Sequence, residues 1–339
     1  MKRLNTFLAT LLFLAAVLVS VNVKAPAQNG DPVVSIIRLD PTFDQLVPKD
    51  ATLEKLTGGY IWTEGPVWDK KHGYLLFSDI PNNAIMKWEP SKGASLFLKP
   101  SGYYGSEPFT GHEPGSNGLT FDSQGRLVMN QHGNRRIARK EADGKETVLA
   151  DHYEGKRFNS PNDLAYKSNG DLYFTDPAYG LPKQLDDPQK ELPFQGVYRL
   201  TPNGKVTVLD KDLKAPNGIA FSPDQKILYV NDSIEVKWWA YDVQKDGSVA
   251  NKRLLLDGND QKKNGPGTAD GMKVDEHGNL YSAGPGGILV ISPTGKILGR
   301  FSMGVPTSNC GWGEDGSTLY ITANTNLYRI KLSTKGAGW

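Results

Sequence analysis

The sequence predicts an all-β protein, a six-bladed β-propeller whose blades each contain four strands. One sequence plan occurs six times: a polar residue, a short apolar strand, a turn containing Gly, Asp or Pro, and a second strand. The units begin 53, 45, 55, 53 and 39 residues apart, a mean of about 49 that is typical of propeller blades. The 339 residues include 37 Gly and 22 Pro, which suits many short strands joined by turns.

The first 27 residues have the layout of a secretory signal peptide. The stretch MKRLNTFLATLLFLAAVLVSVNVKAPAQ has a basic start, an apolar run and a small-residue end at Ala25-Pro26-Ala27. We therefore expect cleavage after Ala27, a single propeller domain over residues 28–339, and a periplasmic or secreted location. A retained membrane anchor is the alternative.

Charge and cysteine content narrow the choice of partners. The net charge of +2 becomes −1 once Lys2, Arg3 and Lys24 leave with the leader, and no basic run remains for nucleic acid or an anionic membrane. The single cysteine, Cys310, cannot form an internal disulfide, and we expect it to be a small buried residue. The expected partner is a small molecule, and the sequence leaves the oligomeric state open.

The repeats also indicate how the ring closes. Each of the first five units is followed by a second hairpin, so that each repeat supplies the four strands of one blade. The sixth unit stops after its third strand, NLYRIKL, whereas a strand candidate without a partner, ATLEKLTGG at 51–59, precedes the first unit. Pairing these two segments would close the ring and cover an exposed sheet edge.

The leading residues of the six units should face one another, because the first strand of each propeller blade lines the central channel. These residues are Glu64, Asn117, Asn162, Asn217, Asp270 and Asn309. Carboxylates and amides that converge in a channel are costly unless a cation neutralises them. Calcium takes about six to eight oxygen ligands, and the lack of His or Cys in the set argues against zinc and copper sites.

The sequence thus predicts a divalent cation, Ca²⁺ first, with Mg²⁺, Mn²⁺ and Zn²⁺ as alternatives. Any single Asn of the set could instead cap backbone groups at a turn or at a strand start.

Several segments together resemble the SMP-30/gluconolactonase/LRE-like family, in particular its bacterial gluconolactonase-like branch. They are EGPVWD, EPGSNGLTFDSQGRLVMNQHG, RFNSPNDLAYKSNGDLYFTDP, PNGIAFSPD and DGMKVDEHGNLY, and the match covers nearly the whole mature chain. The family includes regucalcin and bacterial lactonases, and is similar in architecture to diisopropylfluorophosphatase and the paraoxonases. The resemblance implies four metal ligands, Glu64, Asn162, Asn217 and Asp270, and leaves Asn117 and Asn309 as substrate contacts or spacers.

One position departs from the regucalcin pattern. Regucalcin-like members place a substrate-binding Arg two residues before the Asn-Asp pair, whereas here Arg157 stands five residues before Asn162. Substrate binding and a surface role both stay open for Arg157.

The resemblance implies a lactonase, a carboxylic ester hydrolase that opens sugar lactones such as gluconolactone. The cation would polarise the ring carbonyl and lower the pKa of the attacking water. A neighbouring group must take the proton of this water. Asp270 is the first candidate for this base and Asp163 the second. His132 is the third, unless it is a hydrogen-bonded structural histidine near the channel.

A long connection at 99–116, rich in Gly, Tyr and Pro, is expected to form a lid or a pocket wall. Its Tyr103, Tyr104, His112 and Glu113 are candidate contacts for a polyhydroxylated substrate, and an ordinary surface connection is the alternative. The other long insertion, at 176–196, is expected at the same rim.

Two further classes of function use the same residues. One is a phosphotriesterase or arylesterase with the same ligand set, since specificity lies in the loops. The other is a non-catalytic ligand-binding propeller in which the channel ion is structural. The presence of both Glu64 and Asp270 favours an enzyme.

Overall fold

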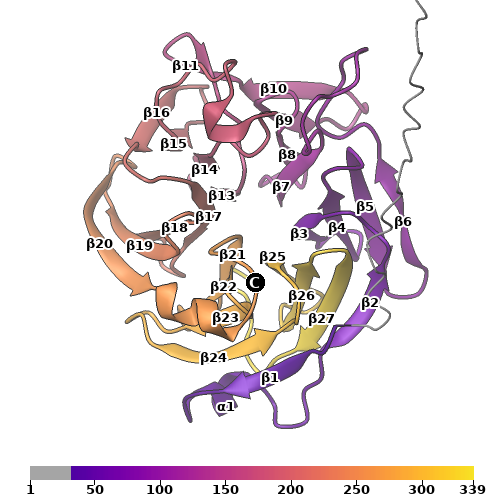
Figure 1. Ribbon diagram of the computed structural model, residues 1–339, viewed down its shortest axis with the longest axis vertical. Helices are drawn as coiled ribbons and strands as arrows, with labels where there is room; N and C mark the ends of the chain where they lie inside the picture. The colour runs from indigo at the N-terminus through magenta and orange to yellow at the C-terminus, as the bar shows by residue number, and fades with distance from the viewer. Residues whose placement is uncertain (1–31) are drawn as a thin grey trace, which may run out of the picture. The chain divides into compact units, whose positions relative to one another are not determined.

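Six antiparallel sheets are arranged around a central channel in the computed structural model, which describes residues 32–339 (Figure 1). This arrangement confirms the predicted six-bladed propeller. The predicted leader, its cleavage after Ala27 and the start of the domain at residue 28 lie outside the described residues.

Each blade begins with its innermost strand. Blade 1 contains β3 (Thr63–Asp69), β4 (Tyr74–Asp79), β5 (Ala84–Glu89) and β6 (Gly93–Leu98). Blade 2 contains β7 (Ser116–Phe121), β8 (Leu127–Gln131), β9 (Arg136–Lys140) and β10 (Glu146–Ala150). Blade 3 contains β13 (Leu164–Tyr166), β14 (Leu172–Asp176), β15 (Gly196–Leu200) and β16 (Val206–Asp210). Blade 4 contains β17 (Pro216–Phe221), β18 (Ile227–Asp232), β19 (Lys237–Val243) and β20 (Val249–Asp257).

The last two blades each include a strand from the N-terminal part of the chain. Blade 5 contains β21 (Met272–Val274), β22 (Leu280–Gly284), β23 (Gly287–Ile291), β24 (Ile297–Ser302) and β1 (Ser35–Arg38). Blade 6 contains β25 (Thr307–Gly313), β26 (Thr318–Ala323), β27 (Asn326–Lys331) and β2 (Glu54–Gly58). The short elements outside the blades are α1 (Phe43–Leu46), β11 (His152–Tyr153), β12 (Lys156–Arg157) and the 3₁₀ turns Gln184–Asp186 and Asn259–Asn264.

The innermost strands contact one another in sequence around the channel, β3 with β7, β7 with β13, and so on to β25, which contacts β3 again. The hydrophobic core is correspondingly divided into six clusters, each packed between two neighbouring blades. Alternating apolar residues on both faces of each sheet produce this arrangement, because each face packs on a different neighbour. The ring therefore positions the channel residues through contacts on both sides of every blade.

The ring closes as the sequence predicts. Strand β2 pairs antiparallel with β27, with Glu54 opposite Arg329, and these two side chains form an ion pair at 2.7 Å. Within the predicted segment 51–59, the paired strand covers Glu54–Gly58. This pairing joins the N-terminal part of the chain to its last strand.

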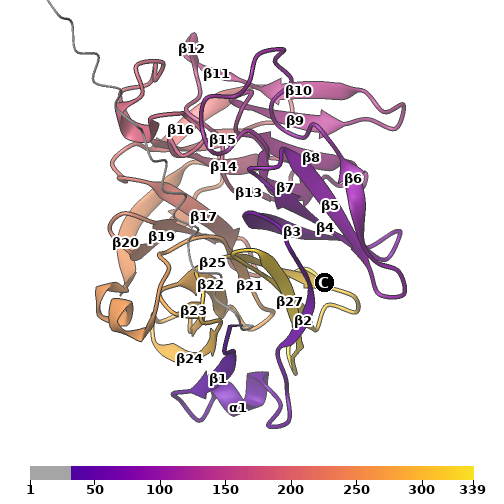
Figure 2. The same ribbon diagram turned by 45° about the vertical axis from the view of Figure 1, so that its right-hand side comes forward.

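An additional N-terminal strand is a feature that sequence reasoning missed. Strand β1 pairs with β24 as the fifth strand of blade 5 and covers its outer edge (Figure 2). The helix α1 follows, and Phe43, Leu46 and Val47 are buried in the cluster between blades 5 and 6. This segment anchors the chain to blade 5 before it reaches blade 6.

Candidate functional site

The recurring Asn-Gly pair is explained by the close approach of neighbouring blades. A Cβ atom on Gly118 would lie 2.5 Å from the backbone oxygen of Asn162, and one on Gly218 would overlap that of Asp270. Glycine therefore lets the carbonyl of the next channel residue come close to the innermost strand. The motif marks the packing of inner strands around the channel.

Polar side chains on the second strands hold the channel residues in place. Thr175, on β14, donates its hydroxyl hydrogen bond to the backbone oxygen of Asn217 at 2.7 Å. Asn231, on β18, donates from its amide to the backbone oxygen of Asp270 at 2.5 Å. Each of these donors belongs to the blade before its acceptor, so the entry into each innermost strand is fixed by its neighbour.

Two of the six leading residues bring carboxylates into the channel. Glu64 is 1% exposed, and its Oε2 accepts hydrogen bonds from the Gly65 amide at 2.5 Å and from Asn309 Nδ2 at 2.9 Å. Burial, with the charge of Asp163 as a second cause, raises the pKa of Glu64 to about 8. Desolvation and the charge of Glu64 raise the pKa of Asp270 well above its ordinary value. The surroundings of the two carboxylates thus do not provide enough positive charge to stabilise their ionised forms.

A third carboxylate, Asp163, occupies the position at which units 2 and 4 have glycine, since NDL replaces NGL or NGI. Asp163 is buried, and its Oδ1 accepts the Leu164 amide at 2.9 Å. Lys273 Nζ lies 3.9 Å from Asp163 Oδ2 and donates to the Met272 carbonyl oxygen at 3.0 Å. Burial raises the pKa of Asp163, and the Lys273 charge opposes this shift.

Sequence reasoning missed Lys273, although a signal was present. It stands between two apolar residues, Met272 and Val274, in the innermost strand of blade 5. A lysine at an inward position of such a strand must bring its ammonium group towards the channel carboxylates, which here it does.

The donor set fits a hard cation. The buried atoms Asn117 Oδ1, Asn217 Oδ1 and Asp163 Oδ2 have no hydrogen-bond partner within residues 32–339. Such oxygens, beside carboxylates of raised pKa, are the ligands that calcium prefers. In this part of the chain no three His, Cys, Asp or Glu side chains form a metal cluster by themselves, so a cation here would depend on the amide oxygens.

Comparison with known proteins agrees with the fold. The model of the SMP-30/gluconolactonase/LRE-like region matches residues 62–325. The chain belongs to this family. A gluconolactonase of Zymomonas mobilis is 39% identical over 91% of this chain and 89% of its own length. The structure of a gluconolactonase from Xanthomonas campestris is 31% identical with a TM-score of 0.76, covering 90% of this chain and 96% of that one.

A relative with another activity is also similar. Diisopropyl-fluorophosphatase of Loligo vulgaris is 27% identical over 80% of this chain and 88% of its own length. Similarity of fold therefore does not distinguish a lactonase from a phosphotriesterase, and the reaction has to be inferred from the residues of the site.

The rim is the end of the ring that carries the loops before β7, after β8 and after β14. These loops contribute Glu113, His132 and Tyr179, respectively. His132 Nδ1 lies 2.8 Å from Glu113 Oε2; the histidine is fully buried, whereas the Glu113 side chain is 25% exposed. Burial raises the pKa of Tyr179 to about 12, and the charges of Asp270 and Glu113 add to this shift. Sequence reasoning placed the 176–196 insertion at this rim but did not single out Tyr179.

The other predicted substrate contacts have different surroundings. Asn309 is buried, donates to Glu64, and accepts the Cys310 amide hydrogen bond at 2.9 Å, so it holds the Glu64 carboxyl group in place. Asn117 is buried in the channel with its unpartnered oxygen. Their substrate contacts stay predictions.

Arg157 lies at the rim, away from the channel set. Its Nη2 donates to the Asn134 backbone oxygen at 3.2 Å, and its backbone amide donates to Glu191 at 2.7 Å. It lines a cavity of about 420 Å³ together with Tyr103 and Phe109, which belong to the predicted lid. Within that lid, Tyr104 donates to Glu146 at 2.5 Å and His112 is exposed.

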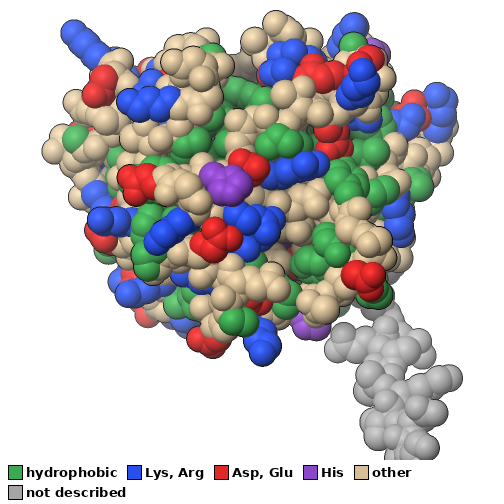
Figure 3. All heavy atoms as spheres, turned by 90° about the horizontal axis from the view of Figure 1, so that it is seen from above, with side chains coloured by type: hydrophobic (Ala, Val, Ile, Leu, Met, Phe, Trp, Pro, Cys, Tyr) green, Lys and Arg blue, Asp and Glu red, His purple; other side chains and the backbone are tan. Residues whose placement is uncertain are grey.

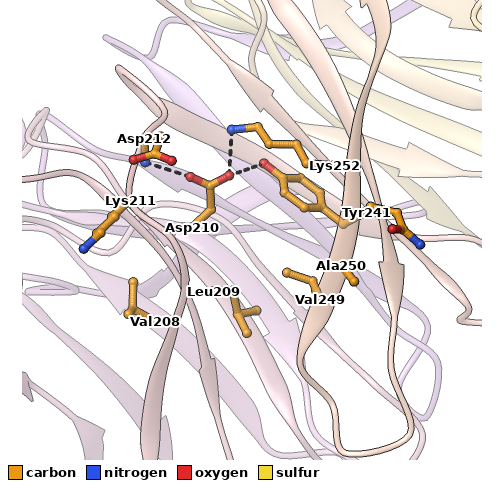
Figure 4. A pocket seen from close by; sticks show the side chains of 10 residues that line it. Val208, Leu209, Asp210, Lys211, Asp212, Tyr241, Val249, Ala250 and Lys252 are labelled. Carbon is orange, nitrogen blue, oxygen red and sulfur yellow. Dashed lines mark hydrogen bonds and ion pairs between the residues drawn. The ribbon is translucent and has the colours of Figure 1, made fainter.

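A second surface pocket, of about 320 Å³, lies between the outer strands β16 and β20 (Figure 4). Asp210 at its centre accepts hydrogen bonds from Tyr241 at 2.7 Å and from the Asp212 amide, and pairs with Lys252 at 2.7 Å. These groups satisfy one another, so we assign the pocket no chemistry.

Acidic and basic side chains are intermixed on the face shown in Figure 3, which is consistent with the absence of a basic run in the sequence. No helix among the described residues is long and apolar enough to cross a membrane.

Proposed function

We propose that this protein is a divalent-cation-dependent lactonase that opens sugar lactones, with Ca²⁺ as its cation. One observation carries the proposal: Glu64 and Asp270, two carboxyl groups of raised pKa, share the channel with Asn117 and Asn217, whose amide oxygens have no hydrogen-bond partner within residues 32–339. The similar proteins from Zymomonas mobilis and Xanthomonas campestris are named gluconolactonases, which supports the same substrate class here.

Four side chains would hold the cation: Glu64, Asn162, Asn217 and Asp270. When bound, a hard cation supplies Lewis acidity to the lactone carbonyl and to the attacking water. Asn309 holds Glu64 in its orientation through the 2.9 Å hydrogen bond. The second-strand donors fix the backbone beneath the site, so that the ligands need little rearrangement when substrate binds.

The proton of the attacking water passes to a channel carboxylate. Asp270 is more accessible than Asp163, which is only 2% exposed and lies beside the Lys273 ammonium group. Accessibility therefore favours Asp270 as the base, and Asp163 is the second candidate. His132 is fully buried and reaches the substrate only through another group.

A phosphotriesterase is the second candidate, because Loligo vulgaris diisopropyl-fluorophosphatase is similar over most of both chains. We also propose that the chain is exported and cleaved after Ala27. The mass of the mature protein in each cell fraction would check this proposal, and an uncleaved cytoplasmic chain would contradict it.

The test measures the hydrolysis of gluconolactone and of a panel of sugar lactones through the protons that hydrolysis releases. The protein is stripped with chelator and then supplied with Ca²⁺, Mg²⁺, Mn²⁺ or Zn²⁺. We expect Ca²⁺ to restore turnover in the wild type, and Glu64→Gln and Asp270→Asn each to lose at least about 100-fold. Asp210→Asn, which removes a carboxylate far from the channel, is the matched control and should keep full activity.

Inactivity of the folded wild type towards all lactones with every cation would contradict the proposal. Turnover of organophosphates or aryl esters by the same samples would then favour the second candidate. Turnover by the chelated protein at the full rate would contradict the cation requirement alone.

A further inference from the structure

The buried histidine at the rim has one acidic neighbour. His132 Nδ1 and Glu113 Oε2 lie 2.8 Å apart as an ion-pair contact, and neither atom makes a hydrogen bond within residues 32–339. His132 Nε2 is also buried without a partner in this region. The two side chains are thus held in contact without a hydrogen bond to any of these three atoms in the described part of the chain.

Packing fixes the imidazole in this position. The His132 backbone amide donates to the Gly115 oxygen at 3.1 Å, which ties the histidine to the loop that carries Glu113. On the other side, a Cβ atom on Gly180 would lie 2.7 Å from His132 Cβ and 2.8 Å from its Cγ. The ring is therefore held between the predicted lid and the loop after β14, and it cannot turn away without moving one of them.

The pair lies at the end of blade 2 where its innermost strand begins. His132 follows the last residue of β8, Gln131, which is paired with Ser116 immediately before Asn117. Glu113 precedes Ser116 by three residues, and its charge contributes to the raised pKa of Asp270. Blades 2 and 5 lie across the ring from each other (Figure 1).

The exposed fractions of the Glu113 and His132 side chains indicate different roles. The Glu113 side chain is 25% exposed and His132 is fully buried. Glu113 can therefore touch a substrate, whereas His132 acts by holding the Glu113 carboxyl group in position.

Lactone hydrolysis requires a proton at a second place, distinct from the attacking water. The water oxygen bonds to the carbonyl carbon, and its proton goes to the channel carboxylate. The bond between the carbonyl carbon and the ring oxygen then breaks, with the electron pair staying on the ring oxygen. An alkoxide is a poor leaving group, so a positioned acid accelerates this step.

We propose that Glu113, oriented by His132, is the acid that protonates the leaving ring oxygen. The Glu113 carboxyl group gives its proton to the ring oxygen, which becomes the hydroxyl group of the product, and Glu113 is left as a carboxylate. Solvent then returns a proton through the exposed edge of Glu113. The assignment rests on the proposed lactonase function and adds a catalytic residue, Glu113, and a positioning residue, His132.

The experiment compares gluconolactone with its 5-thio analogue, in which a ring sulfur replaces the ring oxygen. A thiolate leaves without protonation, so the analogue does not require the acid. For Glu113→Gln we expect kcat on gluconolactone to fall by about 100-fold or more, the range of general acid catalysis, and kcat on the thiolactone to change less than about 5-fold. Glu107→Gln, an exposed carboxylate in the same loop, should leave both substrates unaffected.

His132→Asn is the second variant and should show the same selective loss. An equal loss on both substrates, in proteins with the thermal stability of the wild type, would overturn the assignment in favour of a structural role. Unchanged turnover of both substrates by Glu113→Gln would overturn it as well. Either result leaves the lactonase function standing, because that function fails only if the wild type is inactive towards lactones.

Discussion

At the scale of single residues, the channel combines burial with incomplete hydrogen bonding. Glu64 has two hydrogen-bond donors and is still buried beside other carboxylates, so folding disfavours its charged form. The only ammonium group with described contacts to this set, Lys273, lies nearest to Asp163. The residual negative charge is the property that a bound cation would neutralise.

This imbalance predicts how the chelated protein responds to pH. Folding raises the pKa of Glu64 from 4.5 to about 8, so the folded state binds more protons than the unfolded state between these values. The contribution of Glu64 to stability is therefore lost as pH rises through this window. We expect the difference in Tm between the chelated wild type and chelated Glu64→Gln to shift in favour of the variant as pH rises through the same window.

Thermal unfolding in chelator across this range measures the difference. Added Ca²⁺ should raise the Tm of the wild type at the alkaline end of the window and have little effect on the Tm of Glu64→Gln. Glu54→Gln, at the exposed ring closure, should follow the wild type at every pH. A difference that is flat, or that changes in the opposite direction, would refute the electrostatic argument.

At the scale of elements, the innermost strands depend on glycine at the point where neighbouring blades approach. The Asn-Gly pair could be recognised from the sequence, but its cause could not, because the atom that approaches Gly218 belongs to Asp270, 52 residues later. Isolated Asn-Gly pairs are common in turns. The packing of two inner strands distinguishes this case.

Gly218→Ala should therefore destabilise the ring. Its Cβ would overlap the Asp270 oxygen and force β17 and β21 apart, at a cost of about 1–3 kcal/mol. Denaturant unfolding would measure the loss, and the affinity for Ca²⁺ should fall with it because the Asp270 backbone moves. Gly125→Asn is the control, since Gly125 lies in an open turn with φ of +74° that Asn tolerates. Wild-type stability in Gly218→Ala would disprove the close approach.

At the scale of the whole molecule, the sequence predicts the ring more completely than the site. The six units, the inner position of their first strands and the closure by residues 51–59 all follow from the repeat. Strand β1 was missed because its partner, β24, lies more than 250 residues away and belongs to a blade that is already complete. The pairing of Glu113 with His132 was also beyond the sequence, since each residue was a candidate but their contact depends on how the loop at 99–116 folds back.

Closure matters to the site because blades 6 and 1 meet at the seam between the two ends of the ring. The hydrogen bond from Asn309 to Glu64 crosses this seam, as does that from the Thr63 amide to the Asn324 oxygen. Strand β2 holds the seam through its backbone pairing with β27, although all five of its residues are exposed or half-buried. A cross-link between β2 and β27 should therefore stabilise both the ring and the channel site.

Glu54→Cys with Arg329→Cys provides this cross-link, because the two residues are directly opposite each other in the pairing. In the chain-entropy model a disulfide that closes so long a loop contributes about 5–6 kcal/mol, which corresponds to several degrees in Tm. The native Cys310 should not interfere, since it is fully buried and burial raises its thiol pKa to about 12. We expect Tm to rise on oxidation and to return on reduction, whereas Glu54→Cys alone should not respond. A disulfide that forms without raising Tm would show that opening of the seam is not part of unfolding, and failure to form would contradict the pairing of β2 with β27.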